Sequence, residues 1–134
     1  MGRQEKRMRK RKLVTLFPIL FLVACAARPP HPNQVSLLDG QAYDVLVTAN
    51  TTIDQSKAAL AAGTIPAQSK EVINAAVASY NVLRGAWLTY RHTVELAAPG
   101  TPPSVEQTAV LKSAMTDLTT AISNLQGLTK GGGK

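Results

Sequence analysis

The chain is poor in cysteine, histidine and aromatic residues. It contains one cysteine and two histidines among 134 residues, and aromatic side chains make up 4% of the composition. A single cysteine excludes an intrachain disulfide. The two histidines lie far apart in the sequence, so no closely spaced His and Cys ligands of a zinc site are present. Few aromatic residues beside long alanine-rich runs favour helices over strands.

The excess of positive charge lies at the beginning of the chain. The net charge is +7, with 15 Lys and Arg against 8 Asp and Glu, but seven of the basic residues precede Leu13. After Ala24 the chain carries eight basic and seven acidic residues. This part has no basic stripe interleaved with aromatic residues, which is the pattern that nucleic-acid binding requires. We therefore expect no nucleic-acid partner.

The first 24 residues have the order of a signal peptide: a basic segment up to Lys12, then an apolar run from Leu13 to Ala24. Twelve residues form only about 18 Å of helix, whereas the hydrocarbon core of a bilayer is roughly 30 Å thick. Pro18 also interrupts the run. A permanent membrane span is therefore not expected here. Met8 begins a shorter version of the same pattern, so translation from Met1 or from Met8 gives the same mature product.

The four residues Leu22-Val23-Ala24-Cys25 close this segment. They resemble the lipobox of bacterial lipoproteins, and the resemblance covers residues 1–25 only. It implies cleavage between Ala24 and Cys25 and a lipid on the Cys25 sulfur, with further acylation such as palmitate on the new amino group. Two or more acyl chains suffice for stable attachment to a membrane.

The resemblance also favours one of the two membranes, and it has one alternative. In enteric lipoproteins an aspartate after the cysteine favours the inner membrane, and Ala26 at this position favours the outer membrane. The alternative is an ordinary secretory signal, cleaved for example after Ala27, which leaves no lipid.

The remainder divides into a tether, one helical domain and a tail. Residues 25–35 contain three prolines and are predicted to form an extended tether. Residues 36–128 are enough for one domain with a single core. Residues 129–134 are predicted to be a flexible tail.

Apolar spacing and capping signals predict three helices, over about residues 38–62, 66–97 and 105–126. Ser36 is the expected N-cap of the first helix, with Asp39 in its first turn, and Gly63 its C-terminal stop. Ser104 with Gln107 matches a capping box for the third.

Each predicted helix has an apolar stripe with steps of three and four residues. Ser56 interrupts the first stripe, Gly85 in the second helix suggests close approach of a neighbouring helix, and Gly127 is the expected stop of the third. The stripes comprise Leu38, Ala42, Leu46, Ala49, Ile53 and Leu60; Ile73, Ala76, Tyr80, Leu83, Trp87, Tyr90 and Val94; and Leu111, Met115, Leu118, Ile122 and Leu125.

Three amphipathic helices with short connections predict an all-α antiparallel three-helix bundle on a proline-rich tether. Heptad stripes this regular can also pair between chains, so the sequence leaves the oligomeric state open.

The sequence offers few candidate functional residues. His92 with Glu95 and Arg91 is the one polar group resembling an acid–base cluster, and an exposed Arg–Glu pair explains it better. Trp87 and Tyr90 form an aromatic stripe that either packs in the core or lines a ligand groove, and Trp87 is within stacking distance of an arginine on either side. We predict no catalytic, cofactor-binding or metal-binding residues.

The final residue, Lys134, follows three glycines. In murein lipoproteins a C-terminal lysine is joined to peptidoglycan through its side chain. An odd number of antiparallel helices places the chain's end opposite its beginning, which permits such a tether. The resemblance is limited to the lipid and this lysine, because the murein lipoprotein is one uninterrupted helix.

The sequence therefore predicts a non-enzymatic, lipid-anchored protein of the bacterial envelope. Its helical domain faces the periplasm and serves contacts with an envelope protein or with peptidoglycan. The alternatives are a small-ligand module using Trp87 and Tyr90, and a peptidoglycan tether through Lys134. A phage or plasmid lipoprotein fits the same pattern.

Overall fold

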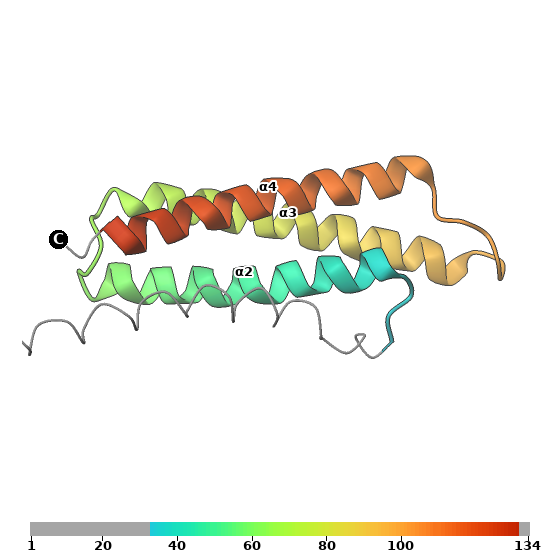
Figure 1. Cartoon of the computed structure of the whole chain (residues 1–134), viewed down its shortest axis with the longest axis horizontal. Helices are drawn as coiled ribbons and strands as arrows, with labels where there is room; N and C mark the ends of the chain where they lie inside the picture. Colours follow the sequence, from blue (N-terminus) through green and yellow to red (C-terminus); the bar gives the residue numbers. More distant parts are fainter. Residues whose placement is uncertain (1–32, 132–134) are drawn as a thin grey trace, which may run out of the picture. The chain divides into compact units, whose positions relative to one another are not determined.

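The computed structural model describes residues 33–131, which form three helices and no strand (Figure 1). Helix α2 spans Leu37–Ala61, α3 spans Ser69–Leu96 and α4 spans Val105–Gly131. Every pair of helices is in contact. The prediction of an all-α three-helix bundle is confirmed.

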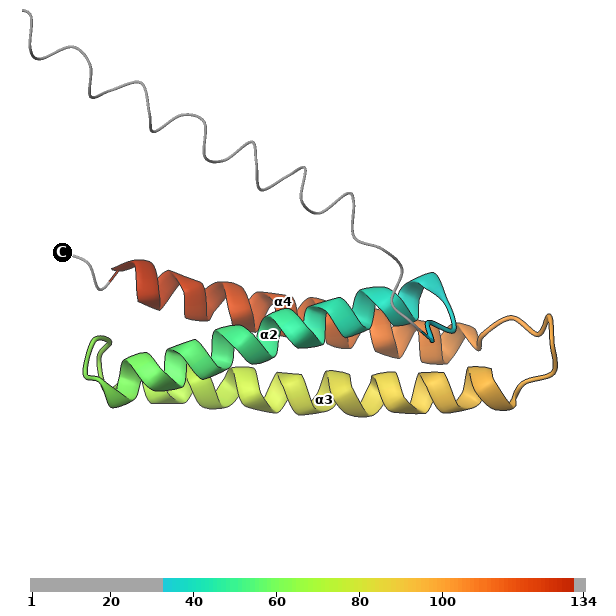
Figure 2. The same ribbon diagram turned by 90° about the horizontal axis from the view of Figure 1, so that it is seen from below.

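The chain reverses direction at each of the two connections between the helices (Figures 1 and 2). As a result, the first turns of α2 and α4 both lie beside the last turns of α3. The contacts agree, because Arg91 donates a hydrogen bond to the Asn33 carbonyl and Gln107 donates one to Thr93 Oγ1. One end of the bundle therefore carries the start of α2, the end of α3 and the start of α4.

Side-chain caps fix the starts of α2 and α4. Ser36 Oγ accepts a hydrogen bond from the Asp39 backbone N–H at 3.1 Å, so the predicted cap of α2 is confirmed. Ser104 Oγ accepts from the Gln107 N–H at 3.4 Å. The Gln107 side chain does not reach back to Ser104 but bonds to Thr93, so only half of the predicted capping box forms.

Gly63 ends α2 as predicted. Its φ of 71° lies in the left-handed region that favours glycine. The Gly63 N–H bonds to the Leu60 carbonyl and the Thr64 N–H bonds to the Ala59 carbonyl, which is the hydrogen-bond pattern of a Schellman motif. The last carbonyls of α2 are thereby satisfied.

The other helix bounds differ from the predicted ones. Helix α3 begins at Ser69 rather than at Pro66, because residues 66–68 form a tight turn in which the Pro66 carbonyl accepts from the Ser69 N–H. Helix α4 continues through Gly127 to Gly131, so residues 129–131 are helical and the prediction of a tail from residue 129 is wrong there. Gly127 keeps a negative φ and does not end the helix, and the buried Leu125 and half-buried Leu128 on either side of it anchor this last part of α4.

The core is built from the predicted stripes, with changes in each. In α2 the buried positions from Asp39 to Ser56, apart from Gly40, follow steps of three and four without a gap. Asp39 and Ser56 occupy stripe positions and are themselves buried, while Leu38 is half-buried. In α4 Ala114 is buried and Met115 half-buried. The buried apolar side chains are Ala42, Leu46, Ala49, Ile53, Ile65, Ile73, Ala76, Leu83, Tyr90, Leu111, Ala114, Leu118, Ile122 and Leu125.

The prediction that a neighbouring helix approaches Gly85 closely is wrong, and a different close contact is found at Gly40. Gly85 is exposed, and a Cβ atom added there would meet nothing within 4 Å. Gly40 is buried, and a Cβ atom there would lie 2.7 Å from Gln34 Cδ. The absence of a side chain at Gly40 lets the segment before α2 fold back against the helix.

These surroundings predict different responses to alanine at the two glycines. Gly85→Ala is expected to raise the free energy of unfolding by about 0.5–1 kcal/mol, because alanine is the better helix former and the space is free. Gly40→Ala is expected to gain less or to destabilise, because Gln34 must move. Urea unfolding followed by circular dichroism measures both. Equal changes in the free energy of unfolding for the two substitutions would contradict this description.

Candidate functional site

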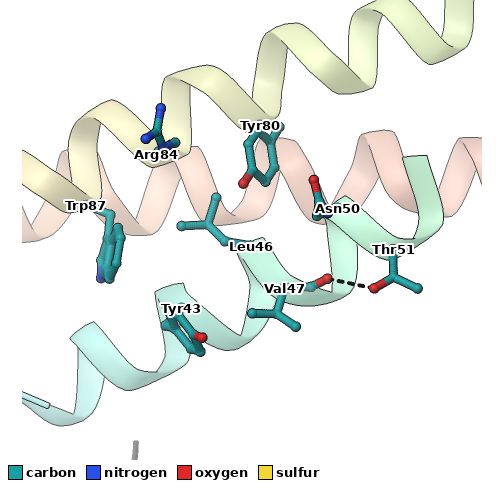
Figure 3. Close-up of a pocket in the computed structure, with 8 residues that line it drawn as sticks. All are labelled: Tyr43, Leu46, Val47, Asn50, Thr51, Tyr80, Arg84 and Trp87. Atoms are coloured by element: carbon teal, nitrogen blue, oxygen red, sulfur yellow. Dashed lines mark hydrogen bonds between the residues drawn. The ribbon is translucent and has the colours of Figure 1, made fainter. Parts of the chain in front are cut away.

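The candidate site consists of an open groove and a buried polar cluster at one end of it. The groove lies between α2 and α3 and has a volume of about 250 Å³ (Figure 3). It is lined by Tyr43, Leu46, Val47, Asn50 and Thr51 from α2 and by Tyr80, Arg84 and Trp87 from α3.

Aromatic rings form much of the groove wall. Tyr80 and Trp87 are seven residues apart, so they share one side of α3, and both extend toward α2 (Figure 3). The Tyr43 ring lies 5.9 Å from the Trp87 ring at an interplanar angle of 45°. Thr51 Oγ1 donates to the Val47 carbonyl at 3.1 Å, so its proton is used within α2. The exposed Arg84 adds a positive charge at the rim, and the groove therefore suits stacking and hydrogen-bonding contacts.

The buried polar cluster is centred on the Asp39 carboxylate, which is 1% exposed. Asp39 Oδ1 accepts a hydrogen bond from Trp87 Nε1 at 2.5 Å, and Oδ2 accepts one from the Val35 backbone N–H at 2.9 Å. Arg91 Nε lies 3.9 Å from Oδ1. Each carboxylate oxygen thus has a donor, and the buried negative charge has a cation beside it, as burial of a charge requires.

Arg91 and Tyr90 extend this cluster to the residues that precede α2. Arg91 Nη2 donates to the Asn33 carbonyl at 3.2 Å and lies 3.3 Å from Glu95 Oε1. The Tyr90 hydroxyl shares a hydrogen bond of 3.0 Å with Ser36 Oγ. Residues 33–36 are therefore fixed to α3. The prediction that 33–35 belong to an extended tether is wrong for these residues, because side chains of α2 and α3 hold their backbone.

The predicted aromatic stripe is divided between two environments. Trp87 is half-buried in the groove wall, and the guanidinium carbon of Arg91 lies 5.4 Å from the centre of its ring, which confirms the predicted stacking. Tyr90 is buried in the core and does not line this groove. It borders a second open hollow of about 370 Å³ between α3 and the start of α4. A ligand in the groove would therefore meet Trp87 but not Tyr90.

The other predicted residues have separate positions. Arg91 and Glu95 form the expected pair one turn apart, and His92 is exposed beside them. Ala24 and Cys25 of the expected cleavage and lipid site, and Lys134 of the expected wall tether, lie outside the described residues, so these assignments stay predictions.

Asp39 is the residue that the sequence reading missed. From the sequence it is expected to be a favourable charge in the first helical turn, and the predicted stripe begins at the neighbouring Leu38. The spacing of the stripe could have identified Asp39 as a core position. A step of four residues back from Leu46 reaches Ala42, and a further step of three reaches position 39. An acidic residue at a core position indicates a buried partner, here Trp87 and Arg91.

Comparisons of the chain with family models, curated proteins and solved structures find no match. Within residues 33–131, no helix is both long and apolar enough to cross a membrane. In the same residues no three His, Cys, Asp or Glu side chains come together in a way that would hold a metal ion.

Removal of the Asp39 carboxylate is predicted to destabilise the fold strongly. Asp39→Ala leaves two part-buried N–H donors without their acceptor and removes the carboxylate that faces Arg91, and we expect a loss of about 2–4 kcal/mol in the free energy of unfolding. Asp39→Asn keeps one acceptor oxygen and is expected to lose less. Urea unfolding measures each variant. The control is Asp54→Ala, an exposed aspartate with one local bond to Asn50, with an expected loss below about 0.5 kcal/mol. Similar losses for Asp39→Ala and Asp54→Ala would refute the role of the cluster.

Proposed function

We propose that this protein is a lipid-anchored component of the bacterial envelope, held on a membrane through Cys25. In this proposal its helical bundle faces the periplasm and acts without catalysis, as an interaction or structural module. The observation that carries the proposal is the sequence Leu22-Val23-Ala24-Cys25 at the end of a basic and then apolar segment. The favoured location is the outer membrane, because Ala26 follows the cysteine.

The composition of the bundle supports an interaction role. Its seams are occupied by packed apolar side chains, so the exposed faces and the groove are the surfaces left for a partner. Large apolar side chains remain exposed on all three helices, among them Val47, Val82 and Val110. An envelope protein or peptidoglycan is the partner class that the proposed location offers.

The anchor is tested by expressing the full chain in a Gram-negative host and measuring the intact mass of the exported product. We expect a product that begins at Cys25, carries the mass of its acyl chains and fractionates with membranes. Cys25→Ser should abolish acylation and cleavage at this site, because the thiol is the lipid acceptor. Ala26→Ser is the matched control and should leave both unchanged. A product that begins at Arg28 with no lipid would contradict the proposal.

A second candidate function is ligand binding in the groove, favoured by the three aromatic rings of Tyr43, Tyr80 and Trp87 around it. Trp87 is the single tryptophan of the chain, so its fluorescence reports directly on this groove. If the groove binds wall fragments, soluble muropeptides should change the Trp87 emission at saturable concentrations, and Tyr80→Ala should weaken the response. An emission spectrum unchanged by muropeptides would exclude this ligand class.

A further inference from the structure

Exposed apolar side chains mark the three helix termini at one end of the bundle. Leu37 is the first residue of α2, Leu96 the last of α3 and Val105 the first of α4, and these side chains are 74%, 73% and 87% exposed. All three termini belong to the same end (Figure 1). Residues 97–104, which connect α3 to α4 at this end, include three prolines.

The opposite end of the bundle lacks this feature among the described residues. Its helix termini are Ala61, Ser69 and Gly131, of which two have small side chains and the glycine has none. The branched apolar residue of the connection there, Ile65, is buried in the core. The apolar character is thus a property of one end and not of helix termini in general.

The apolar end is also the end at which the chain leads back to Cys25. Residues 33–36 are fixed beside the last two turns of α3 by the contacts of Asn33 with Arg91 and of Ser36 with Tyr90. The span from Cys25 to Asn33 is eight residues, which reach at most about 29 Å when fully extended. A lipid on Cys25 therefore keeps this end of the bundle near the bilayer surface.

We propose that the apolar end formed by Leu37, Leu96 and Val105 docks on the lipid surface of the membrane that holds Cys25. This inference rests on the proposed lipid anchor and adds an orientation, in which the bundle stands on its apolar end. Docking is apolar in character, because the nearby Arg91 is already paired with Asp39 and Glu95. It should therefore not require anionic lipids.

The test uses the acylated full chain in phosphatidylcholine vesicles, with one environment-sensitive fluorophore on an introduced cysteine. The sulfur of Cys25 is blocked by its lipid, so the introduced thiol is the only one to react. Val105→Cys reports on the apolar end, and Ala61→Cys is the matched control, an exposed helix terminus at the other end. We expect brominated lipids to quench the label at position 105 at least twofold more than the label at position 61.

A second variant distinguishes docking of the apolar end on the bilayer from the effect of the short tether, which alone keeps this end close to the membrane. Leu37→Ser with Leu96→Ser changes two exposed side chains and leaves the core intact, and it should reduce the quenching at position 105 to the level of the control. Quenching that persists in this variant would overturn the proposal, because the tether alone would then explain it. Quenching only in vesicles with phosphatidylglycerol would also overturn it, in favour of electrostatic adsorption.

Two further outcomes are distinguished in the same samples. A label at position 105 that becomes buried in detergent with rising protein concentration would show that a second copy covers this end, and it would overturn docking on lipid. The intact mass reports whether Cys25 is acylated. A bare thiol refutes the anchor itself, whereas an acylated protein with equal quenching at both ends refutes only the docking.

Discussion

The buried carboxylate of Asp39 joins three parts of the molecule, namely α2, α3 and the residues that precede α2. It binds the indole N–H of Trp87 in α3, the backbone N–H of Val35 before α2, and the guanidinium of Arg91. Apolar seams allow helices to slide by one turn at small cost, whereas a charged group with directed partners is satisfied in one register only. Asp39 therefore fixes how α2 is set against α3 and where the chain enters the bundle.

Much of the fold was predictable because the local signals in the sequence, namely the apolar spacing and the capping residues, agree with the final structure. Stripes with steps of three and four specified three helices, and Ser36 and Gly63 marked the two ends of α2 through ordinary capping chemistry. The helix bounds at Pro66 and Gly127 were less predictable. A proline suits a turn as well as a first helical position, and a glycine ends a helix only when the backbone takes a positive φ.

The site was less predictable than the fold, since polar residues in a core have no periodic signature of their own. Asp39 and Ser56 complete the α2 stripe, but a stripe defined by apolar residues skips them. Trp87 and Tyr90 share one stripe in the sequence of α3. Trp87 lies in the groove wall and Tyr90 in the core because of where the neighbouring helices pack. The spacing of residues along α3 carries no information about those neighbours.

Hydrogen exchange of backbone amides tests the central role of Asp39 most directly. The Val35 amide, bonded to Asp39 Oδ2, and the Asp39 amide, bonded to Ser36 Oγ, lie at or before the first turn of α2, where amides normally exchange fast. The account predicts that both exchange as slowly as amides in the middle of α2, and that the Val35 amide becomes fast in Asp39→Ala, which removes its acceptor. Fast exchange of Val35 in the unmodified chain would contradict it.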